Sequence, residues 1–362
     1  MQSKTLLFYI NAINGGGAER VILEVAQHFA EAGYRAVLVT SFVDPQYEYP
    51  VPPGVIRLFI EQEQIQQSRI RRNISRIAAL RKICKKEKPK AVISFMAEPN
   101  FRAILSTLGL PIKTVVSVRN DPNREYAGRV GRIVGKYFLP MANGCVFQTE
   151  DAKAWFPKRL QKKSAVIMNA VAEPFFEVQR KNARDVVAVG RLNVQKNHEM
   201  LVRAFAKVAD KHPEQNLLIY GKGDQENALR QLISALGLEK RVLLKGATAQ
   251  VPQVLENAGV FVLSSDYEGM PNALLEAMAA GVPSISTDCP CGGPAMLIRH
   301  GENGLLVPVG DEEAMAIAMD RMLSNVAFAE KLSSAARIDA EAYRPEKVFK
   351  LWQQYVEGIV NG

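Results

Sequence analysis

Two glutamates, Glu268 and Glu276, lie eight positions apart in one stretch of the chain. Between them, Pro271 fits the first turn of a helix, where its missing N–H costs nothing, and strong helix-forming residues follow it. Gly281 then supplies a C-terminal stop. The stretch therefore predicts one carboxylate just before a helix and a second one inside it.

The start of this predicted helix suits a diphosphate. Backbone N–H groups in a first helical turn have no partner within the helix, and together with the helix dipole they attract anions. Glu276 could accept hydrogen bonds from a vicinal diol such as ribose O2′ and O3′, because an ionised carboxylate only accepts. An ordinary capped helix with two solvated glutamates is the alternative. We interpret the segment as a sugar-nucleotide site, with contacts expected from Gly269, Met270, Pro271, Asn272 and Ala273.

Strands and helices alternate around this segment. Strands are predicted over 185–190, 216–220, 242–244, 258–263 and 283–287, and helices over 200–208 and 228–236. Elements in this order form a parallel sheet with right-handed crossovers. Because ligands bind at the carboxyl ends of such strands, the loops there are candidate site loops. These loops carry Arg191, Lys196, Gly221, Lys222, Gly246 and Thr248.

The N-terminal segment has a similar order of elements. A strand over 5–10 is followed by a glycine-rich loop over 14–17 and by a helix over about 18–32. Such a loop can approach a phosphate with bare backbone, and a tight turn without a ligand is the alternative. The spacing departs from the dinucleotide-binding pattern, and no acidic residue is evident after the strand that contains 37–40. Nicotinamide binding is therefore disfavoured.

Five segments of the second half carry a resemblance to a known family. They are Gly190-Arg191-Leu192 with Lys196, then Gly221-Lys222-Gly223-Asp224, Glu268-Gly269-Met270-Pro271 through Glu276, Gly281-Val282-Pro283 and Asn303-Gly304-Leu305-Leu306-Val307. With them the chain closely resembles the glycosyltransferase family 4 type of enzyme. The resemblance implies an α/β protein of the GT-B fold, in which two Rossmann-like domains, each a doubly wound parallel sheet, face a central cleft.

The resemblance also implies roles for individual residues. Arg191 and Lys196 would hold the donor diphosphate. Glu268 would contact the transferred sugar, and Glu276 would bind the ribose. The chemistry agrees, since Arg offers phosphate a rigid fork of donors, Lys adds a mobile charge, and both neutralise a departing diphosphate. Taken singly, either cation would be expected to be a solvated surface residue.

Further contacts follow from the same resemblance. Gly16 and Gly17 of the first glycine loop would touch the donor phosphate or the acceptor. Backbone groups around Lys222, Gly246 and Thr248 would read the base, which favours UDP only weakly over GDP or ADP.

Arg119 follows a predicted strand over 114–118, where many relatives place a histidine or another polar residue near the transferred sugar. An unpaired arginine is costly inside a protein, so we expect this side chain to meet an anion or to face water. Arg119 is therefore a candidate catalytic residue, and a histidine-assisted step is not expected.

The length of 362 residues is too great for one ordinary core and predicts two domains. The first, over 1–168, is expected to bind the acceptor. The second, over 183–340, is expected to bind the nucleotide-sugar donor, after a linker over 168–174. By the resemblance, a last helix over 345–362 crosses back to the first domain.

The composition is that of an ordinary globular protein, with 48% apolar and 23% charged residues. No apolar run is long enough to span a membrane and no secretory signal is evident, so we expect a cytoplasmic protein. Four scattered cysteines agree with a reducing compartment, and a metal or redox site at Cys289-Pro290-Cys291 is the minor alternative. Because no Asp-x-Asp pair is present to hold a divalent ion, we expect metal-independent catalysis and no cofactor besides the donor substrate.

Positive charge is concentrated in the first half, where residues 1–170 hold 26 Lys and Arg against 13 Asp and Glu. In its densest run, Ile70, Ile74, Ile77 and Cys84 are expected to form an apolar helix face that packs on the sheet. The cationic face could contact anionic lipid headgroups, each charge adding roughly 1 kcal/mol, and a solvated helix is the alternative. Nucleic acid is disfavoured because no recognition motif accompanies the charge. The candidate patch consists of Arg69, Arg71, Arg72, Arg76, Lys82, Lys85 and Lys86.

These observations predict a retaining, metal-independent glycosyltransferase. It would move a sugar from a nucleotide diphosphate, with UDP favoured, to a hydroxyl of a lipid-linked or cell-envelope glycan; retention is implied by the resemblance alone. The expected partners are the donor, a glycan or polyisoprenyl-diphosphate-linked acceptor, and an anionic membrane surface that the protein touches peripherally from the cytoplasm. A GT-B nucleotide-sugar epimerase and a noncatalytic nucleotide-sugar-binding partner are the alternatives.

Overall fold

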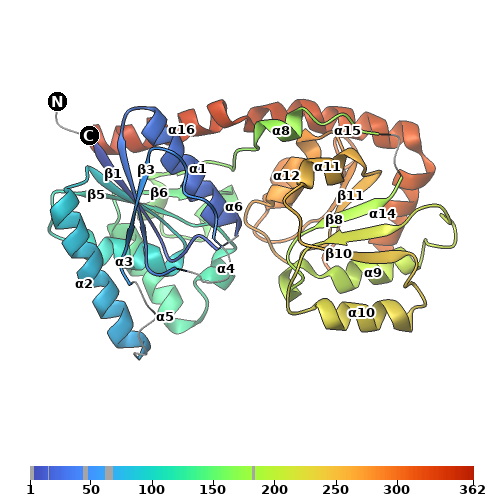
Figure 1. The fold of residues 1–362 in the computed structure, drawn as a ribbon, viewed down its shortest axis with the longest axis horizontal. Helices are drawn as coiled ribbons and strands as arrows, with labels where there is room; N and C mark the ends of the chain where they lie inside the picture. Colours follow the sequence, from blue (N-terminus) through green and yellow to red (C-terminus); the bar gives the residue numbers. More distant parts are fainter. Residues whose placement is uncertain (1–3, 15, 44–47, 62–67, 182–183) are drawn as a thin grey trace. The chain divides into compact units, whose positions relative to one another are not determined.

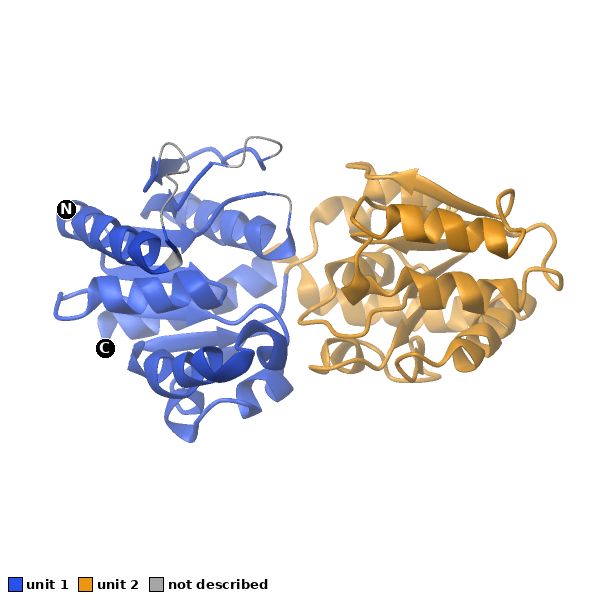
Figure 2. Cartoon of the chain, turned by 90° about the horizontal axis from the view of Figure 1, so that it is seen from below, with its two compact units in different colours: residues 1–169, 346–362 blue, residues 170–345 orange. Residues whose placement is uncertain are grey.

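The computed structural model describes residues 4–14, 16–43, 48–61, 68–181 and 184–362. Residue 15 of the predicted glycine loop and residue 183, where the predicted donor domain begins, lie outside the described residues. The chain divides into two compact units, which Figure 2 distinguishes by colour. Unit 1 comprises residues 1–169 and 346–362, and unit 2 comprises residues 170–345.

Unit 1 is built on a seven-stranded parallel sheet. Its strands are β1 (Thr5–Ile10), β2 (Arg35–Thr40), β3 (Val55–Phe59), β4 (Ala91–Phe95), β5 (Lys113–Ser117), β6 (Gly144–Phe147) and β7 (Ser164–Val166). They lie in the order β3-β2-β1-β4-β5-β6-β7, and every neighbouring pair is parallel. β1 and β4 are buried along their whole length, as expected of apolar strands with both faces covered. The strand order reverses between β1 and β4.

The helices of unit 1 surround this sheet (Figure 1). Trp352 of the last helix is fully buried and stacks on Phe95 of β4, with ring centroids 5.6 Å apart. The hydroxyl of Tyr355 donates to the carbonyl of Lys163 at 2.6 Å. The last helix is thereby fixed to unit 1. The helical elements are α1 (Gly17–Glu31), α2 (Arg69–Glu87), α3 (Ala97–Thr107), α4 (Pro122–Glu125), α5 (Gly128–Ile133), η1 (Val134–Phe138), η2 (Leu139–Met141), α6 (Glu150–Ala154), α7 (Lys158–Gln161) and α16 (Pro345–Asn361).

Unit 2 is built on a six-stranded parallel sheet. Its strands are β8 (Val186–Val189), β9 (Leu217–Tyr220), β10 (Val242–Gly246), β11 (Val260–Leu263), β12 (Ser284–Thr287) and β13 (Leu305–Val307). They lie in the order β10-β9-β8-β11-β12-β13, again with parallel neighbours, so that the order reverses between β8 and β11.

Helices cover both faces of this second sheet. Figure 1 shows α9 (His198–Ala206) and α10 (Glu226–Ala235) on the opposite side of the strands from α12 (Asn272–Ala279). Both units are thus the doubly wound α/β sheets that the sequence predicts, and in such sheets ligands bind where the strand order reverses. The remaining helical elements are α8 (Glu173–Phe176), η3 (Val194–Lys196), α11 (Val251–Glu256), α13 (Gly293–Leu297), α14 (Glu312–Ser324), α15 (Val326–Ala340) and η4 (Glu341–Tyr343).

Candidate functional site

Lys196 and Glu268 meet at the point in unit 2 where the strand order reverses. Lys196 ends η3, which follows β8, and Glu268 lies in the loop that follows β11. The Lys196 Nζ lies 2.5 Å from Oε1 of Glu268. Only 14% of the lysine side chain and 8% of the glutamate side chain are exposed, so the pair is largely removed from water. The two residues that the sequence assigns to diphosphate and sugar are therefore in direct contact.

Two residues that the sequence analysis missed hold this glutamate in place. The Ser265 hydroxyl donates to Oε1 of Glu268 at 2.6 Å. The Gln195 amide donates to the Tyr267 carbonyl at 2.9 Å and reaches Oε2 of Glu268 at 3.4 Å. Gln195 directly precedes Lys196, and Ser265 lies three residues before Glu268. Their position near the motif residues and their hydrogen-bond donors were the available signal.

The loop that carries Lys196 is fixed by its own polar residues. The Asn193 side chain accepts from the backbone N–H of Lys196 at 3.2 Å and caps η3. The Ser264 hydroxyl donates to the Lys196 carbonyl at 2.9 Å, which ties this loop to the end of β11. The backbone on either side of the reversal point is thereby connected, and the Lys196 ammonium group is held near Glu268.

Arg191 has a different environment from Lys196. Its side chain is exposed, and within the part of the chain that the structure describes it makes no hydrogen bond or ion pair. Its neighbour Leu192 is buried and donates its backbone N–H to the Lys222 carbonyl at 3.0 Å. The backbone is thus anchored while the guanidinium is available for a ligand, which suits recognition of phosphate.

His198 is buried close to the backbone of Gly190 and Arg191. Burial, together with the positive charge of Lys196, lowers the pKa of His198 to about 4, and the Gly190 and Arg191 backbone acts in the opposite direction. The imidazole is therefore neutral at physiological pH. A neutral His198 therefore adds no third positive charge beside Arg191 and Lys196.

The predicted nucleotide loops lie at the carboxyl edge of the same sheet. A Cβ atom placed on Gly221 would lie 1.8 Å from the Gly190 carbonyl oxygen, so only glycine allows this approach of the β9 loop to the β8 loop. The Gly246 carbonyl accepts from the Gly221 N–H at 2.9 Å, and the Thr248 hydroxyl accepts from the Gln250 N–H at 3.0 Å. Lys222, which follows Gly221 in the same loop, has an exposed side chain. Their contacts with a nucleotide base stay predictions.

Helix α12 begins one residue later than the sequence indicates. Pro271 is the N-cap and has extended backbone, so that Asn272 and Ala273 start the first turn. Glu276 is buried on the helix, and Met270 is buried just before it, after Gly269. The start of α12 thus follows the Glu268 loop directly, as the sequence predicts. The proposed ribose contact of Glu276 stays a prediction.

The glycine loop of unit 1 differs from a simple phosphate loop. Gly16 is the N-cap of α1 and Gly17 is its first residue. A Cβ atom on Gly16 would lie 2.1 Å from Oε2 of Glu19, so the carboxylate of Glu19 lies against the start of the helix. A glutamate three residues after the N-cap commonly satisfies the helix start itself. The carboxylate of Glu19 therefore lies beside Gly16, and the contacts of Gly16 and Gly17 with donor phosphate or acceptor stay predictions.

Arg119 is buried in unit 1. Its guanidinium donates to Oδ1 of Asn169 and lies 4.7 Å from the centre of the Phe95 ring. Burial lowers the pKa of Arg119 to about 9, and burial raises the pKa of the nearby Glu125 to about 7. The guanidinium is turned away from water, and of the two alternatives that the sequence left open, water or an anion, the structure excludes water. A catalytic role for Arg119 stays a prediction.

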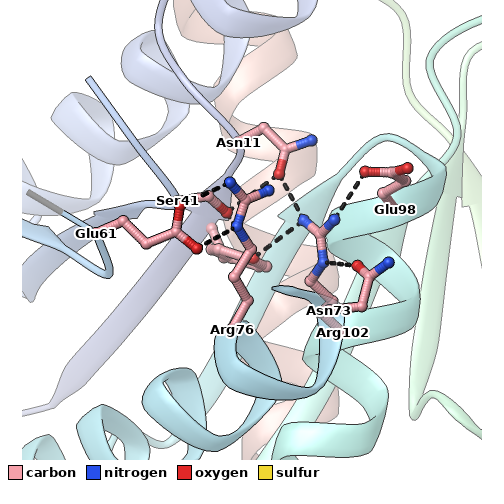
Figure 3. A network of polar contacts seen from close by, with 8 residues as sticks. Asn11, Ser41, Glu61, Asn73, Arg76, Glu98 and Arg102 are labelled. Atoms are coloured by element: carbon pink, nitrogen blue, oxygen red, sulfur yellow. Dashed lines mark hydrogen bonds and ion pairs between the residues drawn. The ribbon is translucent and has the colours of Figure 1, made fainter. Parts of the chain in front are cut away.

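The predicted cationic patch on α2 needs two corrections. Arg76 is buried rather than exposed, because its guanidinium donates twice, at 2.8 Å each, to the carboxylate of Glu61 (Figure 3). Ile70 and Ile74, expected to pack on the sheet, are 74% and 62% exposed.

The length of α2 explains the second correction. A 19-residue helix is about 28 Å long and a five-residue strand about 17 Å, so the first turns of α2 extend past the sheet. Cys84 is buried, as the sequence predicts, and Leu80 is buried with it in the same cluster. Arg71, Lys82, Lys85 and Lys86 are exposed, Arg72 is half-buried, and the Arg69 side chain lies outside the described part.

Among the described residues, no three His, Cys, Asp or Glu side chains gather in a way that could hold a metal ion. No helix in the described ranges combines the length and apolar character needed to cross a bilayer.

Two family models match consecutive parts of the chain. The model described as Glycosyltransferase Family 4 matches residues 15–173, and the model described as Glycosyl transferases group 1 matches residues 171–339. Each match coincides closely with one of the two units.

Individual proteins give the same result. A Campylobacter jejuni enzyme named GalNAc-alpha-(1->4)-GalNAc-alpha-(1->3)-diNAcBac-PP-undecaprenol alpha-1,4-N-acetyl-D-galactosaminyltransferase is 25% identical, over 98% of each chain. Exopolysaccharide phosphotransferase SCO2592 of Streptomyces coelicolor is 34% identical over 61% of this chain, but the match spans only 24% of that protein. The crystal structure of Anabaena Alr3699/HepE in complex with UDP and glucose shares the fold, with a TM-score of 0.83, 17% identity and coverage of 97% and 99%. The chain therefore belongs to the family 4 type of glycosyltransferases with the GT-B fold, and it is an enzyme that transfers a hexose or an N-acetylhexosamine.

Proposed function

We propose that the donor is a UDP-sugar and that Arg191, Lys196 and the start of α12 hold its diphosphate. The observation that carries this proposal is the contact of Lys196 with Glu268 at 2.5 Å, where the strand order of unit 2 reverses. The exposed guanidinium of Arg191 lies on the loop after the same strand, β8. The UDP found in the Anabaena neighbour supports the choice of nucleotide.

The proposed reaction retains the anomeric configuration of the sugar. The bond between the anomeric carbon and the diphosphate oxygen breaks, and a new bond forms to the acceptor oxygen. The departing phosphate oxygen takes the acceptor proton, while Arg191 and Lys196 stabilise its charge. Glu268 orients the donor sugar, and the two cations, rather than a divalent ion, neutralise the diphosphate.

The proposed acceptor is a glycan linked to a polyisoprenyl diphosphate. The name of the Campylobacter jejuni relative gives such a compound as its acceptor. The excess of basic residues in the first half of the chain suits an acceptor that carries a diphosphate and is embedded in an anionic membrane.

We also propose that unit 1 touches the cytoplasmic face of a membrane, through a surface broader than the predicted one. Val130, Ile133 and Tyr137 are large exposed apolar residues on α5 and η1. The exposed cations Arg129, Arg132 and Lys136 alternate with them. Apolar side chains among cations are the pattern of an element that lies in the lipid interface. Ile70 and Ile74 on α2, next to the exposed Arg71, have the same character.

The test of the proposed function begins with donor binding. We expect a UDP-sugar to raise the melting temperature more than GDP- or ADP-sugars do. With the best donor, membrane lipid extract should yield a glycosylated product whose new linkage retains the donor configuration by NMR, and a chelator should leave the rate unchanged. Isomerised donor in the absence of acceptor, or no thermal shift with any nucleotide sugar, would contradict the proposal.

A pair of arginine variants shows whether the site is the one described. Arg191→Ala should lower the rate of transfer about 100-fold without changing the melting temperature, since its side chain is exposed and unpaired within the described residues. Arg203→Ala removes a similar charge from the exposed surface of α9 and should leave transfer unchanged. Equal rates for the two variants would place the diphosphate elsewhere.

A further inference from the structure

The sheet of unit 1 has its own point of strand reversal, between β1 and β4. Asn11 follows β1 at its carboxyl end. Met96, Ala97 and Glu98 follow β4 at the same edge, and Glu98 lies in the first turn of α3. In doubly wound sheets this is the position at which ligands bind. The diphosphate contacts proposed above are assigned to unit 2, and at this edge of unit 1 only Gly16 and Gly17, which precede or begin α1, have a predicted ligand contact.

A buried arginine lies at this edge. The Arg102 side chain is 2% exposed, and its guanidinium donates to three close acceptors and to the more distant Tyr9 hydroxyl of β1, at 3.5 Å (Figure 3). The close acceptors are Oδ1 of Asn11 at 2.6 Å, Oδ1 of Asn73 at 2.8 Å and Oε2 of Glu98 at 2.7 Å. The guanidinium is thereby fixed by β1, α2 and α3 together.

Glu98, the ion-pair partner of Arg102, is open to solvent, whereas Glu61, the partner of the nearby Arg76, is not. Arg76 and Glu61 form a closed pair, with side chains 7% and 9% exposed. Glu98, in contrast, is 45% exposed although Arg102 is buried. A buried cation that holds a solvent-exposed carboxylate adds little net stability, because the free energy of burying the charge is about as large as the free energy gained from the ion pair. It is an effective way to hold a carboxylate in one orientation.

The backbone next to Glu98 is strained. Met96 has φ of +76°, a region that side chains other than glycine rarely adopt, at the junction of β4 and α3. Such strain is concentrated at functional positions in proteins. The strained junction sets where α3 begins, and hence where Glu98 presents its carboxylate.

We propose that Glu98 recognises the acceptor sugar, and that Arg102 is the residue that positions it. The carboxylate accepts hydrogen bonds from hydroxyl groups of the acceptor, a role that suits a vicinal diol. A hydroxyl-bearing, uncharged part of the acceptor fits this edge better than its diphosphate, because Glu19 adds a second carboxylate at the start of α1. This inference rests on the proposed transfer to a glycan and deepens it.

The test compares Glu98→Gln with a matched surface variant. Glu150→Gln makes the same change on α6, where the side chain is 68% exposed. The probe is a short-chain polyprenyl-diphosphate-linked N-acetylgalactosamine oligosaccharide, with the donor that gives the largest thermal shift. We expect Glu98→Gln to raise the KM for this acceptor about 10- to 100-fold. The KM for the donor, and the melting temperature of the variant measured in the presence of donor, should both stay close to those of the wild type. Glu150→Gln should match wild type throughout.

Variants of Arg102 separate positioning from simple stability. Arg102→Lys keeps the charge but cannot hold three acceptors in one plane, so the acceptor KM should rise as it does for Glu98→Gln. The double variant should be no worse than the worse single variant, because both changes disturb one contact.

The outcomes distinguish this inference from the proposed function. An acceptor KM within about twofold of wild type in Glu98→Gln, or equal loss of donor binding, would overturn the role of Glu98 while leaving glycosyl transfer intact. A wild-type protein that binds no nucleotide sugar would overturn the proposed function and this inference with it.

Discussion

Lys196 and Glu268 form an ion pair at the point in unit 2 where the strand order reverses, with Nζ 2.5 Å from Oε1. In the proposed donor complex, the single ammonium group serves both the carboxylate and the diphosphate. Ser265 also donates to Oε1 of Glu268, at 2.6 Å, so the carboxylate keeps a partner when the lysine turns to phosphate. We expect donor binding to shift the Lys196 ammonium group from Glu268 toward the diphosphate, because this cation already has a partner before the donor binds.

The two partners should respond differently to substitution. Lys196→Met should weaken donor binding about 10- to 100-fold, because a charge-assisted contact to phosphate is lost. Glu268→Gln should leave donor binding unchanged or tighter, since the ammonium no longer has a competing carboxylate, while kcat falls about 100-fold. Calorimetric titration with the donor, followed by steady-state kinetics, measures both effects.

A surface lysine provides the control for these variants. Lys207 pairs with Glu313 on the exposed surface of unit 2, and Lys207→Met should match wild type in both measurements. If Glu268→Gln weakened the donor as strongly as Lys196→Met does, the idea of a shared ammonium would be wrong.

His198 should make stability depend on acidity. Its pKa is lowered from 6.5 to about 4 in the folded state, mainly by burial, so the unfolded chain binds the proton more readily. Its contribution to stability is complete above pH 6.5 and is lost as the pH falls from there toward 4. At pH 5 the loss amounts to about 2 kcal/mol.

Urea unfolding at pH 7.5 and pH 5 checks this expectation. Carboxylates that titrate in the same range affect wild type and His198→Gln alike, so the difference between the two proteins isolates the histidine. We expect the stability deficit of His198→Gln to shrink, or to reverse, at the lower pH. A deficit of equal size at both values would show that His198 titrates normally in the folded protein.

Much of unit 2 was predictable because its signals are local. Gly190, Gly221 and Gly281 mark strand or helix ends, and the helix-forming run after Pro271 is unambiguous. Since parallel strands bring their carboxyl ends to one edge, the order of the elements predicted that the loops carrying Lys196 and Glu268 lie at the same edge, but not that the two side chains pair. The chain positions of Gln195 and Ser265 were visible, but which atoms they contact depends on tertiary packing.

The surface of unit 1 was harder to predict. The periodicity of apolar residues placed Ile70 and Ile74 on an apolar helix face. This pattern does not show at which residue α2 extends beyond the edge of the sheet. Arg76 was assigned to the patch because charged residues are mostly exposed, and only the fold brings Glu61 to it. The network around Arg102 joins residues from β1, α2 and α3, so no local pattern indicates it.

Gly221→Ala should impair the donor site through the backbone. The added Cβ would lie 1.8 Å from the Gly190 carbonyl, so the loop that carries Arg191 must shift. We expect a loss of about 2–3 kcal/mol in stability and at least tenfold weaker donor binding. Gly237→Ala is the control, since it introduces only backbone strain, at φ of +68° with no atom within 4 Å, and should leave donor affinity unchanged. Similar donor affinity in the two variants would exclude a role for this close approach.

The exposed apolar residues of α5 should govern membrane contact. Val130→Ser combined with Ile133→Ser should reduce binding to vesicles of phosphatidylcholine and phosphatidylglycerol about tenfold, because buried apolar area at the interface is lost. Vesicle sedimentation at low and high salt measures this. Ile317 and Ile338 are equally exposed but belong to unit 2, and their serine variants should bind as wild type does. Unchanged binding of the α5 variant would mean that α5 does not touch lipid.

The crystal structure of the protein with its preferred nucleotide sugar tests the central claim most directly. We predict diphosphate oxygens at about 2.7–3.2 Å from the Arg191 guanidinium and the Lys196 ammonium group, beside the start of α12. Glu268 should then contact the sugar. A diphosphate bound away from the reversal point of β8 and β11, or either cation directed away from the phosphates, would contradict the account.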